Sequence, residues 1–371
     1  MTTTPHSEKK LLVAMELSNN KWLLAFSNGE KIRRKSMDAR DRIGFMVEVR
    51  RAKEKLGMDA ETPVLCCYEA GRDGFWIYRW LREVGFECLV IDPASIEVNR
   101  RKRRAKTDRL DAEAMARLLG RYAGGEKKIW AVVRVPSEEQ EDELRLHREM
   151  GRLKKERTGH LNRIKALSIL HGIKLSGKLT KLLENLDDLT CWNNKPLSDG
   201  LKEEVRRELK RLRLVEEQIK ELEQKKVEAL KNPQTNAEYQ ARDLIRLRGV
   251  GEVSAWVLSK EFFGWREFRN RREVAALAGL TPTPYNSGGS IIEQGISKSG
   301  NPRIRRIMIE LAWSWIRFQP ESELTNWFLD RYAKGGRRAR RIGIVAVARK
   351  LLVALWKYVE FGEVPKGAII Q

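Results

Sequence analysis

The sequence has few cysteines and histidines, and their spacing argues against two kinds of site. Four cysteines occur in 371 residues, with Cys66 and Cys67 adjacent in an apolar run and no Cys-x-x-Cys pair. We expect them to be reduced core residues of a cytoplasmic protein. The four histidines are scattered without the spacing of metal ligands, so we expect no zinc site.

Long apolar segments are also lacking. The best candidate for a membrane span, residues 342–356, is interrupted by Arg349 and Lys350, whereas a span needs about 20 apolar residues. The N-terminus, MTTTPHSEKK, is followed by an apolar run too short for a signal peptide. We therefore expect no membrane partner. No zinc-finger or RNA-recognition signature that would read bases is present either.

Positive charge, in contrast, is in large surplus. The chain carries 73 Lys and Arg against 51 Asp and Glu, a net charge of +22. Such a surplus favours a polyanionic partner, either nucleic acid or an anionic membrane. Because the membrane interpretation has no apolar segment behind it, the expected partner is nucleic acid.

The first 130 residues or so alternate strand and helix patterns. An Asn-Gly turn at residues 28–29 between two apolar stretches predicts a hairpin. The expected order is three strands, then helix, strand, helix, strand and helix, which is an α/β layer with a hairpin entry. The strands are predicted at residues 10–17, 21–27, 31–37, 63–69 and 87–91, and the helices at 38–56, 75–84 and 107–122.

The rest of the chain is predicted to be mainly helical. Apolar residues recur at helical spacing over residues 144–170 and 201–222, and the other faces of both segments are charged. This pattern is typical of a coiled-coil hairpin or oligomerisation arm, and a plain helical spacer fits it as well. The last segment begins near residue 241 and is rich in Gly and Pro between residues 279 and 302.

Four carboxylates stand where a site could form. Asp108 and Asp111 share one face of a predicted helix, just after a run in which seven of the ten residues Arg100–Arg109 are basic. Glu16 and Glu69 end the first and fourth strands, and strand ends meet at one edge of a mostly parallel sheet. Such oxygen ligands suit Mg²⁺. Alternatively, the two aspartates only balance the basic run and favour the helix start.

Four segments together resemble a known family. They are VAMELSNNKW, VLCCYEAGRDGFW, IDPASIEVNRRKRRAKTDRLDAEAMA and LAGLTPTPYNSGGSIIEQGISKSGNPRIRR. In this order, over nearly the whole chain, they resemble the DEDD-type transposases of bacterial insertion sequences, some of which are bridge-RNA-guided recombinases. The resemblance implies a ribonuclease-H-like (RuvC-like) domain over residues 1–130, a helical coiled-coil arm over 131–240 and a mainly helical C-terminal domain over 241–371.

The resemblance also implies the residues of the active site. The family's four metal-binding acids, which hold Mg²⁺ or Mn²⁺, fall on Glu16, Glu69, Asp108 and Asp111. The first of these is usually Asp, and a Glu reaches one methylene further. The family's nucleophilic serine aligns best with Ser287. Ser290 is the second choice, ahead of Ser297 and Ser299.

Four basic or glycine-rich stretches are candidate nucleic-acid-binding segments. A Gly-Val-Gly turn resembles a helix-hairpin-helix module, and Asn301 with Pro302 predicts the start of a helix amid basic side chains. The basic run and residues 331–341 could track a phosphate backbone. The residues are Arg100, Arg101, Lys102, Arg103, Arg104, Lys106, Arg109, Gly249, Gly251, Lys298, Arg303, Arg305, Arg306, Arg337, Arg338, Arg340 and Arg341.

The sequence therefore predicts a transposase or recombinase that cuts and rejoins the DNA strands of an insertion sequence. Its expected partners are donor and target DNA, a guide (bridge) RNA and further copies of itself in a dimer or tetramer. Its expected location is the bacterial cytoplasm, in association with the nucleoid. Two alternatives stay open: a Mg²⁺-dependent junction-resolving nuclease in which water attacks, and a non-catalytic nucleic-acid-binding scaffold.

Overall fold

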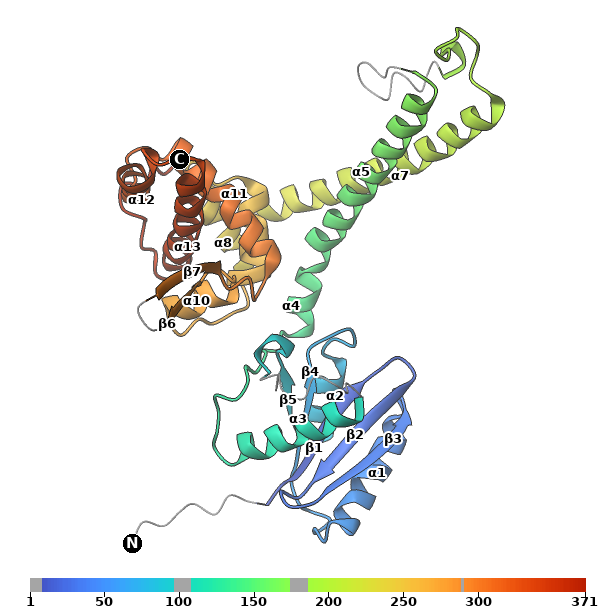
Figure 1. The fold of residues 1–371 in the computed structure, drawn as a ribbon, viewed down its shortest axis with the longest axis vertical. Helices are drawn as coiled ribbons and strands as arrows, with labels where there is room; N and C mark the ends of the chain where they lie inside the picture. The colour runs from blue at the N-terminus through green and yellow to red at the C-terminus, as the bar shows by residue number, and fades with distance from the viewer. Residues whose placement is uncertain (1–8, 97–107, 174–185, 288–289) are drawn as a thin grey trace. The chain divides into compact units, whose positions relative to one another are not determined.

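The computed structural model describes residues 9–96, 108–173, 186–287 and 290–371 (Figure 1). For residues 108–110 and 286–293 within these ranges, it describes the backbone only. The chain divides into two compact units, Met1–Val135 and Pro136–Gln371. The division into three domains expected from the family resemblance stays a prediction.

The first unit contains a mixed five-stranded sheet. Its strands are β1 (Leu11–Leu17), β2 (Lys21–Ser27), β3 (Ile32–Asp38), β4 (Val64–Glu69) and β5 (Glu87–Ile91), in the order β3-β2-β1-β4-β5. β2 pairs antiparallel with both β1 and β3, whereas β1, β4 and β5 pair in parallel. Only β2 runs against the others, so β1 and β4 end at the same edge. The predicted α/β layer with its hairpin entry is confirmed.

Helices cover both faces of this sheet. α1 (Arg42–Lys55) and α2 (Trp76–Glu83) pack on one face, and α3 (Asp108–Ala123) packs on the other, over β1 and β2 (Figure 1). Because strand side chains alternate between faces, Leu12 and Ala14 face α3, whereas Val13 faces α1 and α2. Cys66, Cys67 and Cys88 are buried as expected, and burial raises the pKa of Cys88 to about 12.

The second unit begins with a helical hairpin. α4 (Glu138–Glu143) starts at a capping box on Ser137 and leads into α5 (Arg145–Leu170), which packs against α7 (Asp199–Lys231). The start of α5 contacts the late part of α7 and its end contacts the early part, so the two helices are antiparallel. The two predicted long helices are confirmed. Their winding as a coiled coil and their part in oligomerisation stay predictions.

The remaining helices enclose one core. They are α8 (Asn236–Ile245), α9 (Glu252–Leu258), α10 (Arg271–Leu277), α11 (Pro302–Phe318), α12 (Glu323–Phe328) and α13 (Arg337–Phe361), with single π-helical turns at Ser259–Phe263 and Leu329–Ala333. Trp256, Trp315 and Trp356 lie in or beside this core, as aromatic residues at helical spacing usually do. Trp313 is the exception, with 49% of its surface exposed.

The stretch rich in Gly and Pro, for which the sequence predicts no strand, contains a β-hairpin. β6 (Pro282–Ser287) pairs antiparallel with β7 (Ser290–Ile296), and Ser287 is the register partner of Ser290. A Gly-Gly pair between two strands is a known hairpin signal, and Ile291 and Ile292 follow it here. The two prolines of β6 obscured that signal, because proline is depleted in strands. An edge strand tolerates proline, and β6 has only one neighbour.

Candidate active site

Glu16 and Glu69 line the same pocket, at the edge of the sheet where β1 and β4 end. The register of the parallel pair runs to Met15 opposite Tyr68, so the two glutamates are the next residues on adjacent strands. Both side chains are half-buried and face a hollow of about 240 Å³. We term this hollow the acidic pocket. The structure thus brings together two of the four carboxylates that the sequence singled out.

The first turn of α3 lies level with these strand ends. A methyl group built on Gly120 would lie 3.5 Å from Leu12 Cδ1, so the late part of α3 covers the start of β1. From Gly120 back to Ala112, α3 extends about 12 Å along its axis. From Leu12 forward to Glu16, β1 extends about 13 Å, so the start of the helix reaches the end of the strand. Alternation along β1 puts Glu16 on the face that α3 covers.

Asp111 is half-buried and directly precedes Ala112, which packs on the sheet. It does not line the acidic pocket. Asp108 begins α3, but its side chain lies outside the described residues, as does that of Arg109. Among the described side chains, no three of His, Cys, Asp or Glu lie close enough to hold a metal ion together. Two carboxylates facing one hollow are nevertheless a donor set that Mg²⁺ or Mn²⁺ accepts.

Sequence reasoning missed a third carboxylate in this pocket. Asp73 lines it with a side chain that is only 8% exposed, and its Oδ2 lies 3.3 Å from Arg72 Nη2. The turn that carries Asp73 folds back on β4, since Gly74 has a φ of 66° and its carbonyl accepts a hydrogen bond from the Tyr68 hydroxyl. The Gly-x-x-Gly spacing after the strand was the signal for that turn.

The predicted nucleophile lies on the β6–β7 hairpin. Ser287 is the last residue of β6 and Ser290 the first of β7, although neither side chain is among those described. Ser297 is further from the turn, where its hydroxyl accepts a hydrogen bond from Thr281. Ser299 lies against Gly279, since a Cβ on that glycine would meet the Ser299 carbonyl at 2.1 Å. Those two serines thus belong to the base of the hairpin.

Beside the hairpin, Asn301 begins α11 as predicted, with Pro302 at the first helical position. Its side chain accepts hydrogen bonds from the amides of Arg303 and Ile304. The Arg305 guanidinium donates to the carbonyls of Lys298 and Ala278. Arg305 therefore has a structural role at this helix start.

Arg303 contacts a buried carboxylate. Its guanidinium lies 2.6 Å from Oε1 of Glu261, which is 2% exposed. Arg148 binds the same carboxylate through Nε and Nη2, and His147 Nε2 lies 2.8 Å from it. Burial opposes ionisation of Glu261, but the bonds from Arg148 and His147 outweigh it and hold the pKa of that carboxyl well below its usual range. This network ties α5 to α11.

The other predicted nucleic-acid residues that the structure describes fall into three groups. Gly249 has a φ of 87°, and a Cβ built on it would lie 3.0 Å from the Cβ of Phe318. Gly251 is the N-cap residue of α9. Arg306 is exposed near Glu310. The last group begins α13 with exposed side chains: Arg337, Arg338, Arg340 and Arg341. The basic run lies outside the described residues: Arg100, Arg101, Lys102, Arg103, Arg104 and Lys106. Binding by any of these residues stays a prediction.

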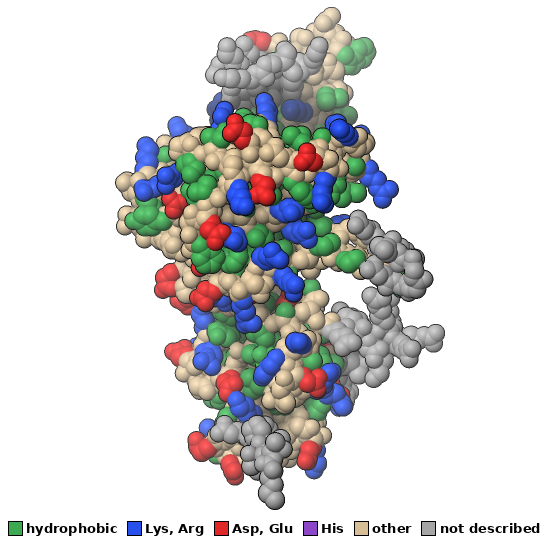
Figure 2. Space-filling model, turned by 90° about the vertical axis from the view of Figure 1, so that its left-hand side faces the viewer, with side chains coloured by type: hydrophobic (Ala, Val, Ile, Leu, Met, Phe, Trp, Pro, Cys, Tyr) green, Lys and Arg blue, Asp and Glu red, His purple; other side chains and the backbone are tan. Residues whose placement is uncertain are grey.

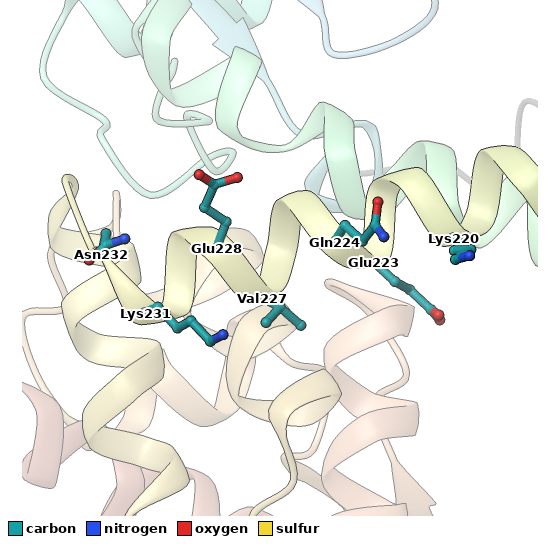
Figure 3. Close-up of a pocket in the computed structure, with 7 residues that line it drawn as sticks. All are labelled: Lys220, Glu223, Gln224, Val227, Glu228, Lys231 and Asn232. Atoms are coloured by element: carbon teal, nitrogen blue, oxygen red, sulfur yellow. The ribbon is translucent and has the colours of Figure 1, made fainter.

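The side chains that line a hollow along α7 do not form a candidate binding or catalytic site (Figure 3). Six of its seven lining residues lie on that helix, and the seventh, Asn232, caps its C-terminal end. In Figure 3, Gln224 and Glu228 point to one side of α7, whereas Glu223, Val227 and Lys231 point to the other. Carboxylates and lysines alternate there without converging on one point. We assign it no function.

Charge of both signs is spread over the face of the molecule that Figure 2 draws. Figure 2 shows Lys and Arg side chains interspersed with Asp and Glu on the face it draws, rather than gathered in one basic sheet. No helix in the described part of the chain is long and apolar enough to cross a membrane.

Comparison with known proteins identifies the family. A family model for transposases of the DEDD type matches residues 18–173, and one described as "Transposase IS116/IS110/IS902 family" matches residues 241–325. The protein named "Putative transposase y4rJ" of Sinorhizobium fredii is 41% identical over 375 residues, which cover 97% of this chain and 94% of that protein. The chain belongs to the IS110-type DEDD transposases.

More distant relatives point the same way. The transposase for insertion sequence element IS1533 of Leptospira borgpetersenii is 26% identical and the alignment covers 82% of this chain and 85% of that protein. The transposase for IS1328 of Yersinia enterocolitica is 24% identical, with coverage of 79% and 83%. The predicted family is confirmed. Transposition of DNA is the activity that the family implies for this chain, with DNA as partner.

Proposed function

We propose that this transposase cuts and rejoins DNA strands with a bound divalent cation and a serine nucleophile. The acidic pocket is the observation that carries the proposal, because two carboxylates from adjacent strand ends face one hollow. The level of α3 supports adding its two aspartates to the same site. The residues that would hold Mg²⁺ or Mn²⁺ are Glu16, Glu69, Asp108 and Asp111.

In this proposal, Ser287 is the attacking group. A bound cation would stabilise the negative charge that develops on the phosphate. Ser287 Oγ forms a bond to phosphorus as the bond to one strand oxygen breaks, and that oxygen leaves as a hydroxyl. The serine proton passes to a base. A strand hydroxyl later attacks the phosphoserine, which restores the serine and joins the strands. The placement of Ser287 at the end of β6, paired with Ser290 at the start of β7, supports this role, since the end of a two-stranded hairpin can approach DNA.

Covalent trapping tests the proposal. The full chain is incubated with end-labelled element DNA and Mg²⁺, then denatured, and label that migrates with the protein is measured. We expect adducts with the wild type and with Ser290→Ala, and none with Ser287→Ala. An adduct that persists in Ser287→Ala would refute the assignment. Cleavage without any adduct would indicate a nuclease that uses water, and binding without cleavage would indicate a scaffold.

Guidance by a structured RNA rests on the family resemblance and is also proposed. Sequencing the RNA that copurifies with the protein tests it. A discrete RNA encoded beside the gene is the expected result, and random cellular RNA alone would contradict it. The proposed dimer or tetramer is tested by measuring the mass of the assembly with light scattering.

A further inference from the structure

A second pocket, in the C-terminal unit, gathers positive charge that none of the predicted sites includes. It has a volume of about 630 Å³ and lies between α10, α12 and α13. Four cationic side chains and a single carboxylate line it: Arg271, Arg272, Arg349, Lys350 and Glu323. We term it the basic pocket.

The fold does not use these cations for internal pairing. Elsewhere in the unit, an inward-facing cation is matched: Lys260 Nζ lies 3.0 Å from Glu238 and 3.4 Å from Glu143. Arg271, Arg272 and Arg349 form no ion pair with any described carboxylate. Arg271, Arg272 and Lys350 are exposed and Arg349 is half-buried, so all four are open to a partner. Solvent weakens the repulsion between these like charges, and a bound anion would relieve it further.

An aromatic wall fixes one of the four cations. Trp327 lines the pocket half-buried, and the Lys350 ammonium lies 4.6 Å from its ring centroid. Tyr332 braces the indole edge-on at 5.6 Å. A cation held over an indole face is stabilised by the ring electrons. Trp327 is therefore a positioning residue, which keeps the Lys350 charge at the pocket.

We propose that the basic pocket binds phosphates of a nucleic-acid backbone. Guanidinium groups match phosphate oxygens in pairs, and a lysine adds a point charge. A small dianion would not need four cations from two helices, whereas successive phosphates of a strand present one charge after another. The shared chemistry is the phosphodiester, whether it comes from DNA or RNA.

The pocket adjoins the base of the β6–β7 hairpin. Thr281 lines it and immediately precedes β6, and its hydroxyl donates to Ser297 across the hairpin base. From Thr281 to Ser287 an extended strand spans about 20 Å, which is the rise of about six stacked nucleotides. A strand gripped here would thus be held about six nucleotides from the serine. This last step rests on the proposed function, whereas phosphate binding does not.

Binding of labelled oligonucleotides tests the inference. Affinity of the full chain, without divalent cations, is measured between 50 and 200 mM salt for single-stranded DNA, duplex DNA and RNA of one length. Each lost phosphate contact lowers the slope of log affinity against log salt by about one. We expect Arg271→Gln with Arg349→Gln to lower it by about two. Arg349→Lys should restore about half of that loss.

Two matched variants sharpen the test. Glu323→Gln removes the one carboxylate among the described residues that line the pocket, and should tighten binding about threefold at low salt. Lys357→Gln removes one positive charge, as each arginine substitution in the pocket does, but elsewhere on α13, where Lys357 pairs with Glu363. It should leave the slope unchanged. Melting curves confirm that each variant is folded.

The three probes identify the source of the phosphates. The probe whose slope falls most in the double variant is the natural occupant, and an equal fall in all three indicates a grip on the backbone alone. An unchanged slope on every probe, or weaker binding in Glu323→Gln, would overturn the inference. Failure of the serine proposal is separate, because it would appear as an adduct in Ser287→Ala while the slopes here still change.

Discussion

The acidic pocket and the basic pocket carry opposite charges on supports of different stiffness. Glu16 and Glu69 stand at the ends of hydrogen-bonded strands whose register fixes their backbone. The cations of the basic pocket extend on long side chains from α10 and α13. Metal coordination requires oxygens placed within about 0.2 Å, whereas attraction between a cation and a phosphate falls gradually with distance. A substitution in the acidic pocket should thus abolish its function, whereas a substitution in the basic pocket should weaken binding only in part.

The largest expected effect comes from removing a charge of the acidic pocket. Glu69→Gln should lower the rate of strand cleavage by about 1,000-fold or more, because an amide is a poor ligand for a divalent cation. Changing the salt concentration should not restore the rate. Glu87→Gln is the control, since Glu87 begins the neighbouring strand β5 and pairs at the surface with Lys10. Comparable cleavage rates for Glu69→Gln and Glu87→Gln would contradict this contrast between the acidic and basic pockets.

A change of reach within the acidic pocket should have a smaller effect. Glu16→Asp keeps the charge but draws the carboxylate back by one methylene, so we expect cleavage to fall by about 10- to 100-fold. The cleavage rate of Glu16→Gln should fall as far as that of Glu69→Gln. Rates are compared over a range of Mg²⁺ and Mn²⁺ concentrations, and excess metal should partly rescue the aspartate variant only. If Glu16→Gln cleaves at the wild-type rate, Glu16 is not a ligand.

The Glu261 network separates cations that build the fold from cations that bind a partner. Glu261→Gln leaves Arg148, Arg303 and His147 without their shared carboxylate, and should reduce the free energy of unfolding by about 2 kcal/mol. The pKa of Glu261 is lowered in the folded chain. Its contribution is therefore present above the pKa of the unfolded glutamate, and is lost as pH falls below that value.

Urea unfolding between pH 3 and pH 7 measures this effect. The difference between the wild type and Glu261→Gln should be largest at neutral pH and shrink toward pH 3. Glu208→Gln gives a matched comparison, because Glu208 is also buried and is held by His160, Arg163 and Arg211 in the helical hairpin. A Glu261→Gln variant as stable as the wild type at pH 7 would mean that the network adds nothing.

Most of the fold could be predicted from the sequence because its periodicities are strong. Four of the five strands of the first unit read as short apolar runs, and the charged strand β3 is indicated by the Asn-Gly turn before it, which is present with Gly29 at a φ of 97°. The β6–β7 hairpin was not predicted, since its prolines and glycines are typical of loops as well. What decides between the two is pairing with a distant segment, which local propensity does not contain.

The candidate site was predictable only in part for a related reason. Strand ends could be read from the sequence, so the neighbouring positions of Glu16 and Glu69 followed from parallel pairing. The Gly-x-x-Gly spacing indicates the turn that carries Asp73, but the position of its carboxylate depends on how that turn folds over β4. The basic pocket was missed because the pair Arg271 and Arg272 lies far in the sequence from the pair Arg349 and Lys350, and neither pair alone is a long basic run. Only the packing of α10 against α13 brings them together.

The smallest expected effect concerns the basic pocket, where we expect a substitution to weaken binding only in part. The Arg271→Gln and Arg349→Gln double variant should cleave subsaturating DNA more slowly than the wild type, and the deficit should shrink as salt rises. Two lost phosphate contacts change the affinity ratio by about tenfold between 50 and 200 mM salt. Saturating DNA should restore the rate, because the variant keeps all four carboxylates and the serine. A deficit that persists at saturation would place these arginines in the chemical step and abolish the distinction between the two pockets.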